Sequence, residues 1–336
     1  MHRLILPTIL AGVLTVAACT AGVARAASDP QLEALLASIE NGRGGYAEAL
    51  KHVDANAMDA TRGTPLIVAA LHGNVDAVRA LLAAGADPNR AYAPLQDARA
   101  RTPLNAAALV GDEAIVGALL DAGADPGRAI DGDGTPLIMA ARSGKPGVVR
   151  LLLARKADPN VAVRGDGTAL IAAIRGGNAA IVDALLAAGA KPGLGVEGDG
   201  TPLIAAVVRK NVDLAKRLAA AGADVNAVSR GDATPLIAAV RTGDAAVVDA
   251  LLALGADVNG EAPGDETPLI NAARGGNVAL VERLLDKGAD PNRISRGDRS
   301  AKYPDGYPHS PIDAARTAGA AAVVAVLERR GAQAAK

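Results

Sequence analysis

A tetrapeptide of the Thr-Pro-Leu-Ile kind recurs along most of this 336-residue chain. Its copies begin at Thr64, Thr102, Thr135, Thr168, Thr201, Thr234 and Thr267, and a degenerate copy begins at Ser310. Between Thr102 and Thr267 each copy follows the one before it by 33 residues. A fixed period of this length predicts one small unit stacked many times. The composition agrees. Because the chain has four Tyr, no Phe and no Trp, it has few large aromatic side chains to fill one deep core.

Each unit has the signals of two short helices and a turn. The Thr can cap a helix, and the Pro after it occupies a first helical position without losing a hydrogen bond. Glycines such as Gly111 and Gly123 stand where each helix should end in a left-handed cap. Helices this short are marginal in isolation, so the stacking of units must stabilise them.

This pattern resembles the ankyrin repeat, whose signature is T-P-L-H-x-A at a period of 33. The resemblance implies an all-α ankyrin-repeat solenoid with hairpin-like turns and a concave binding surface. We expect a signal peptide over residues 1–26 and a single repeat domain over residues 27–336. Within that domain we expect a degenerate opening repeat at about 30–58, regular repeats at about 61–293 and a capping repeat with an insertion at about 294–330.

The sequence departs from the family pattern at two kinds of position. The His after Thr-Pro-Leu is Ile in six units, Asn105 in one and Asp313 in the last, so we do not expect the hydrogen bond that this His makes between repeats. Lys210 stands where the first helix of a unit normally ends in Gly. We expect that change to cost about 1 kcal/mol locally.

The first 26 residues predict export from the cytoplasm. Arg3 precedes an apolar run from Leu4 to Ala18, which is typical of a secretory signal peptide. The segment ending at Cys19 resembles the bacterial lipobox and implies a lipid on this cysteine and anchoring in the outer membrane, whereas the segment ending at Ala26 fits ordinary cleavage. Both cleavage sites remain open. We expect a periplasmic or secreted protein, with membrane attachment only through that lipid.

The charge and the residue inventory argue against several functions. With a formal net charge of −1, the chain lacks the excess of basic residues that is typical of a nucleic-acid binder. The four His are scattered, and one Cys cannot form a thiolate metal cluster. We therefore expect no nucleic-acid partner, metal, cofactor or catalytic site, and a protein that is not an enzyme.

Two sets of charged residues recur with the repeat. Arginines near the end of the first helix are Arg142, Arg175, Arg241 and Arg274. Acids in Gly-Asp turns are Asp133, Asp166, Asp199, Asp232 and Asp265. The resemblance places both on the concave surface, as a basic strip beside an acidic rim that binds a partner; the alternative is that these arginines are merely solvated helix formers. Replacing Arg175, Arg241 and Arg274 by Glu is expected to abolish partner capture and leave thermal unfolding nearly unchanged.

Three tyrosines lie in irregular insertions between repeats: Tyr92, Tyr303 and Tyr307. Aromatic residues placed outside the repeat core are typical of interface anchors, although a loop tyrosine can also cover the end of a solenoid. We interpret them as candidate partner contacts. The sequence as a whole favours a monomeric, non-enzymatic protein-interaction scaffold in the bacterial cell envelope. The alternative is an inhibitor or immunity protein that blocks a periplasmic or secreted enzyme.

Overall fold

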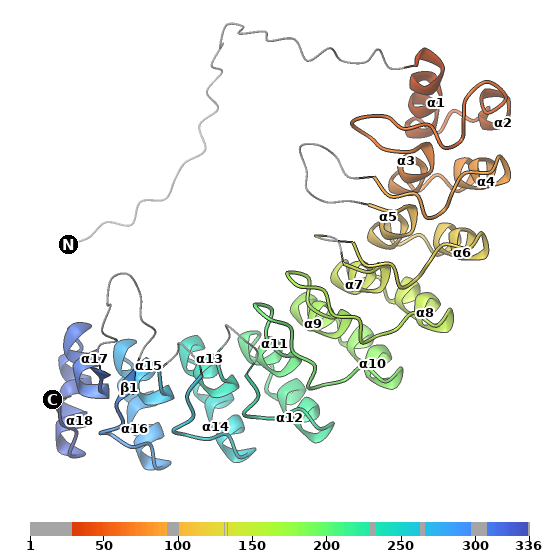
Figure 1. The fold of residues 1–336 in the computed structure, drawn as a ribbon. Coiled ribbons are helices and arrows are strands. Elements are labelled where there is room, and N and C mark those ends of the chain that lie inside the picture. Colours follow the sequence, from red (N-terminus) through yellow and green to blue (C-terminus); the bar gives the residue numbers. More distant parts are fainter. Residues whose placement is uncertain are drawn as a thin grey trace, which may run out of the picture.

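The computed structural model describes residues 29–92, 101–130, 132, 134–228, 233–262, 266–296 and 308–334. In these residues the chain forms a curved stack of helix pairs, with one helix of each pair on the concave side and the other on the convex side (Figure 1). This confirms the predicted all-α ankyrin-repeat solenoid. The hairpin-like turns project from the inner helices on the concave side (Figure 1). The regular repeats therefore present a single continuous inner face.

The helix bounds follow the repeat. The inner helices are α3 (Pro65–Leu71), α5 (Pro103–Val110), α7 (Pro136–Arg142), α9 (Ala169–Gly176), α11 (Pro202–Val208), α13 (Pro235–Thr242), α15 (Pro268–Arg274) and α17 (Pro311–Thr317). The outer helices are α4 (Val75–Ala83), α6 (Glu113–Asp121), α8 (Pro146–Ala154), α10 (Ala179–Ala187), α12 (Val212–Ala220), α14 (Ala245–Ala253), α16 (Val278–Asp286) and α18 (Ala321–Arg329). At the N-terminal end, α1 (Pro30–Glu40) and α2 (Tyr46–Ala49) pack on α3 and α4. Strands β1 (Ser295–Arg296) and β2 (Pro308–His309) pair antiparallel before α17.

The repeated Thr begins each regular inner helix as predicted. In α7, for example, the Thr135 hydroxyl accepts a hydrogen bond from the amide of Ile138 at 3.2 Å. The alanines and aliphatic residues behind it are buried and join the units into a nearly continuous core. No helix in the described part of the chain combines the length and the apolar character needed to cross a membrane.

Asparagines in the turns that follow α2, α4, α8, α12, α14 and α16 connect neighbouring repeats. The Asn226 side chain donates to the Gly255 carbonyl at 3.3 Å, and its oxygen accepts from the Asp257 amide at 2.8 Å. The same pair of bonds recurs along the stack at Asn56, Asn89, Asn160, Asn259 and Asn292. These bonds satisfy backbone groups at the ends of the outer helices, so the stack is held by polar contacts as well as by its core.

The expected absence of a hydrogen bond at the family's His position is wrong for one unit. Asn105 is buried, donates to the Gly134 carbonyl of the next repeat at 3.1 Å and accepts from the Thr102 hydroxyl at 3.0 Å. An amide side chain can replace the imidazole because it carries both a donor and an acceptor. At the equivalent position of the next unit, Ile138 is buried and makes apolar contacts instead.

Two lysines occupy left-handed backbone positions that glycine fills in the other repeats. Lys210 follows α11 with a φ of 56°, and Lys156 follows α8 with a φ of 65°. Such a conformation costs a residue with a Cβ about 1 kcal/mol relative to glycine.

Replacing Lys210 with Gly is therefore expected to stabilise the protein by about 1 kcal/mol. The midpoint of urea unfolding should rise. Lys216→Gly is the matched control, because Lys216 lies exposed inside α12, where glycine costs about 1 kcal/mol. Equal destabilisation by the two substitutions would show that Lys210 is not strained.

Candidate binding surface

The last residue of each inner helix, or its near neighbour, forms a row along the concave side. The row reads Leu71, Leu109, Arg142, Arg175, Val208, Arg241, Arg274 and Thr317. The two leucines are partly buried, and the six residues from Arg142 onward are exposed. The four arginines expected from the sequence therefore lie in one exposed row, and ion pairs of Arg142 and Arg175 with acids of the hairpin turns place it beside those turns. We call this set the concave row.

Two arginines of the concave row are paired with turn acids of the following repeat. Arg142 forms an ion pair with Asp166. Arg175 binds Asp199 twice, from Nη1 to a carboxylate oxygen at 3.2 Å and from Nη2 to the backbone carbonyl at 2.7 Å. The second Asp199 oxygen accepts the Gly165 amide at 2.7 Å, so this acid also joins two neighbouring hairpin tips.

These contacts differ from the expected acidic rim beside a basic strip. The side chains of Asp166 and Asp199 are only 4% and 6% exposed, whereas those of Arg142 and Arg175 are 41% and 47% exposed. The acids lie below the surface and hold the guanidinium groups, which face outward. Because a buried carboxylate depends on its cationic partner, these contacts argue against the expectation that replacing Arg175, Arg241 and Arg274 by Glu leaves thermal unfolding nearly unchanged.

The other two arginines of the row have different partners. Arg274 binds the buried Glu266 at 2.5 Å, within its own repeat. Arg241 donates from Nε to the Asn271 side chain of the next repeat at 3.1 Å. Asp133, Asp232 and Asp265, which the sequence marked as turn acids, lie outside the described residues. The partner-binding role of the arginines and acids stays a prediction.

Val208 is the one exposed aliphatic residue of the concave row. It is 59% exposed, whereas its neighbour Val207 is completely buried in the core. Val208 stands one repeat after Arg175 and one repeat before Arg241. The surface thus presents an aliphatic side chain between arginine positions.

Tyr92 has contacts inside the protein. Its backbone pairs with Arg101 across the first insertion, and its hydroxyl donates to the carbonyl of Ala60 in the preceding hairpin. Its ring lies so close to Gly63 that a Cβ there would stand 2.8 Å from the ring. Burial, together with the charge of Asp59, raises the pKa of the Tyr92 hydroxyl. Tyr92 thus packs on the preceding hairpin, and its role as a partner contact stays a prediction. Tyr303, Tyr307 and Cys19 lie outside the described residues.

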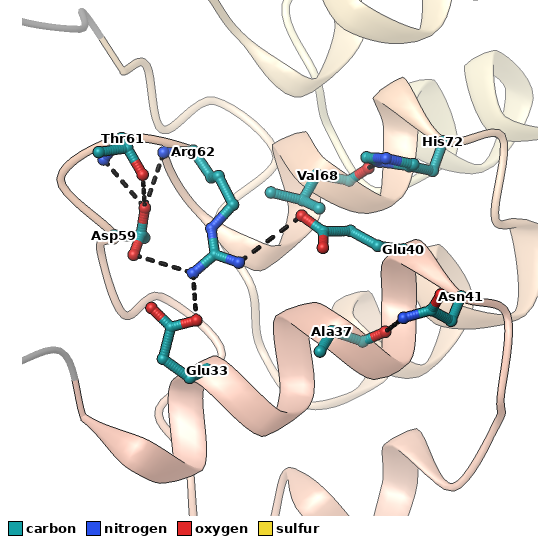
Figure 2. Close-up of polar contacts among 9 residues, drawn as sticks. All are labelled: Glu33, Ala37, Glu40, Asn41, Asp59, Thr61, Arg62, Val68 and His72. Carbon is teal, nitrogen blue, oxygen red and sulfur yellow. Dashed lines mark hydrogen bonds and ion pairs between the residues drawn. The ribbon is translucent and has the colours of Figure 1, made fainter. Parts of the chain in front are cut away.

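A cluster that the sequence did not predict lies at the N-terminal end of the concave side. Figure 2 shows the Arg62 guanidinium among three carboxylates: Nη2 is 2.6 Å from Glu33 and 3.2 Å from Asp59, and Nη1 is 3.6 Å from Glu40. Arg62 and Asp59 come from the first hairpin, and both glutamates come from α1. The cluster therefore attaches the opening helix to the first regular repeat.

Hydrogen bonds keep Asp59 and Arg62 of this cluster charged. Burial alone would raise the pKa of Asp59, but bonds from Arg62 and from the hydroxyl and amide of Thr61 outweigh it and hold that pKa well below its usual range. The bond to Asp59 raises the pKa of Arg62 against the opposing effect of burial. The pair is ionised at neutral pH. In the described residues, no group of three His, Cys, Asp or Glu side chains is placed to hold a metal ion.

A family model and a solved structure both match this chain as ankyrin repeats. A family model described as "Ankyrin repeats (3 copies)" matches residues 20–129, 91–163, 137–229 and 203–295. A solved structure, the human ASB11 ankyrin repeat domain, is 30% identical in sequence with a TM-score of 0.54, and the match covers 70% of this chain and 100% of that one. No match is found among curated proteins.

Proposed function

This chain belongs to the ankyrin-repeat family, and from that premise we propose that it is a non-enzymatic scaffold that binds a protein partner on its concave row. Ankyrin-repeat domains generally mediate protein–protein interaction. The observation that carries the proposal is the exposed Val208 between the arginine positions at 175 and 241.

The physical basis is the contrast between Val208 and its neighbours. Val208 offers apolar area that a partner can remove from water, which favours association. Arg175 is already held by Asp199, so less side-chain freedom remains to be lost on binding. Arginine is also enriched at protein interfaces. A partner with an apolar residue flanked by acceptor groups would complement this surface.

Replacing Val208 with Arg is expected to weaken partner binding about tenfold or more, because an apolar contact is lost and a long charged side chain enters the interface. The fold should tolerate the change, since four other repeats carry Arg at this position. The measurement is quantitative capture from envelope extracts on the immobilised protein, followed by the Kd of the captured protein. The matched control is Ala246→Arg, at an exposed position on the outer helix α14.

The proposal would be contradicted if both variants lost binding equally, or if neither variant lost binding. Assay of the captured protein distinguishes the kind of role. A scaffold leaves the activity of its partner intact, whereas abolition of enzyme activity at one-to-one stoichiometry would assign the inhibitor role instead.

We place this function outside the cytoplasm, in the bacterial cell envelope. The support is the signal-like segment 1–26 and the lipobox-like residues before Cys19. Radiolabelled palmitate is expected to label the expressed protein, and Cys19→Ala should remove the label. Labelling that survives the substitution would contradict lipidation at Cys19, and a secreted, unlabelled protein would favour cleavage after Ala26.

A further inference from the structure

The asparagine bridge between neighbouring repeats is missing at two junctions of the stack. In the regular repeats the bridging asparagine stands 25 residues after the repeated Thr, as Asn160 does after Thr135. The residue at the same place is Gly127 in the turn after α6 and Gly193 in the turn after α10. Glycine has no side chain to donate or accept, so these two junctions lack the pair of hydrogen bonds that Asn160 makes to the next repeat.

The outer helix α12, which follows the second of these junctions, also has smaller side chains than its neighbours. Its fourth residue, Ala215, is completely buried, whereas the fourth residue of every other outer helix from α4 to α18 is valine. Its eighth residue is Ala219, whereas α4, α6, α8, α10, α14 and α16 have leucine there. Because protein cores are close-packed, smaller side chains weaken the contact with the neighbouring repeat. A cavity of about 260 Å³ lies at this junction, lined in part by Val182 of α10 and Leu214 of α12.

Other junctions have one of these two features but not both. The α6–α8 junction also lacks the bridge, but α8 has the usual Val149 and Leu153. An open groove lies between α14 and α16, but there the Asn259 side chain donates to the Gly288 carbonyl at 3.2 Å. Among the junctions that the structure describes, the α10–α12 junction alone combines a missing bridge with a smaller outer helix. It lies in the middle of the curved stack (Figure 1).

Polar contacts across this junction are strongest at the ends of the inner helices. There Arg175 of α9 binds the buried Asp199 of the next hairpin, and Arg209 after α11 donates from Nη1 to the Arg175 carbonyl at 2.9 Å. Between the outer helices, Arg217 forms an ion pair with Asp183. The side chains of that pair are 53% and 54% exposed, and exposed ion pairs contribute little to stability. The outer half of the junction is therefore held weakly.

We propose that the α10–α12 junction is a joint that divides the stack into two blocks, which open separately. The first block ends with α10 and the second begins with α11. In a stack whose units contact only their neighbours, stability is the sum of unit and junction terms, so the weakest junction sets where a cooperative opening stops. The concave row is shared between the blocks, with Arg175 on the first and Val208 on the second. The inference goes beyond the proposed function, because it holds for the free chain.

The first test restores the missing bridge with Gly193→Asn. A Cβ at this position would stand 3.9 Å from the Gly222 carbonyl oxygen, which is an ordinary contact distance. Gly127→Asn is the matched control, since it adds the same bridge inside the first block. Amide hydrogen exchange is measured for each helix of the full-length chain. We expect Gly193→Asn to raise the protection of α13 and α15 about fivefold and Gly127→Asn to leave it unchanged, because only the former strengthens a junction that breaks when the second block opens.

The second test does not depend on a new bridge. Thr135→Ala removes the hydroxyl that caps α7, and it should lower the protection of α5, α7 and α9 about fivefold. The protection of α13 and α15 should stay unchanged, because these helices open with the second block.

Equal increases in the protection of α13 with the two glycine variants would overturn the proposal, because the whole chain would then open as one unit. It would also be overturned if Gly193→Asn gave no increase, or if Thr135→Ala lowered the protection of α15 as much as that of α5. None of these measurements involves a partner, so failure of this inference is distinguishable from failure of the proposed function, which the capture with Val208→Arg tests.

Discussion

Replacing Arg62 with Gln is expected to destabilise the opening unit of the stack by about 2 kcal/mol. The substitution leaves Glu33, Glu40 and the buried Asp59 without the cation that they share. The loss of stability is smaller than that expected for a fully buried ion pair, because the Arg62 side chain is 26% exposed. Amide hydrogen exchange should accelerate in α1, and exchange in α13 and α14 should stay unchanged, since distant repeats interact only through their neighbours.

The effect of pH on this region should also change. In the native protein the lowered pKa of Asp59 contributes stability that is fully present above the unfolded value of about 4 and is lost as the pH falls below it. In the variant Asp59 loses the Arg62 bond that helps to lower its pKa, so less stability should be lost as the pH falls below about 4. The matched control is Arg79→Gln, at an exposed position on α4. Unchanged exchange in α1 would show that the cluster does not hold the opening helix.

Replacing Arg175 with Glu is expected to destabilise the central repeats by about 2 to 3 kcal/mol. The new carboxylate would stand where a guanidinium now binds Asp199, whose side chain is only 6% exposed. Replacing the arginine leaves a charge below the surface that keeps its hydrogen bond from the Gly165 amide but loses its cationic partner. Urea unfolding should show the loss as a lower midpoint.

Two comparisons make this expectation specific. Arg175→Met removes the cation without adding an anion, and its cost should be about half as large. Arg150→Glu places the same charge at an exposed position on the outer helix α8, where the effect should stay within about 0.5 kcal/mol. A cost for Arg175→Glu no larger than that for Arg150→Glu would mean that Asp199 does not depend on its arginine.

The repeat architecture was predictable because each unit carries its own local signals. The Thr-Pro pairs mark the starts of the inner helices, and the glycines mark left-handed ends such as Gly111 and Gly177. The concave charges were predictable as two separate sets but not as pairs. A constant spacing of 24 residues joins Arg142 to Asp166 and Arg175 to Asp199, and that spacing is the sequence signal that would have revealed the ion pairs.

Other features of the structure were not predictable, or only in part, and for different reasons. Glu33 and Glu40 lie in the opening unit, outside the 33-residue period, so nothing in the sequence placed them beside Arg62. The bridge at Asn105 was missed because the departure from the family's His was read as a lost hydrogen bond, although an amide can also donate. The sequence shows Val208 as an aliphatic residue at a position where four other repeats carry arginine. Its exposure depends on which way the last turn of α11 faces, and only the structure shows that.

The central claim is that a protein partner occupies the concave row. Hydrogen–deuterium exchange of the captured complex, compared with the free chain, tests it most directly. The account predicts slower exchange at the ends of α9, α11 and α13, centred on Val208, with no change in α10, α12 and α14. Protection confined to these outer helices would contradict it.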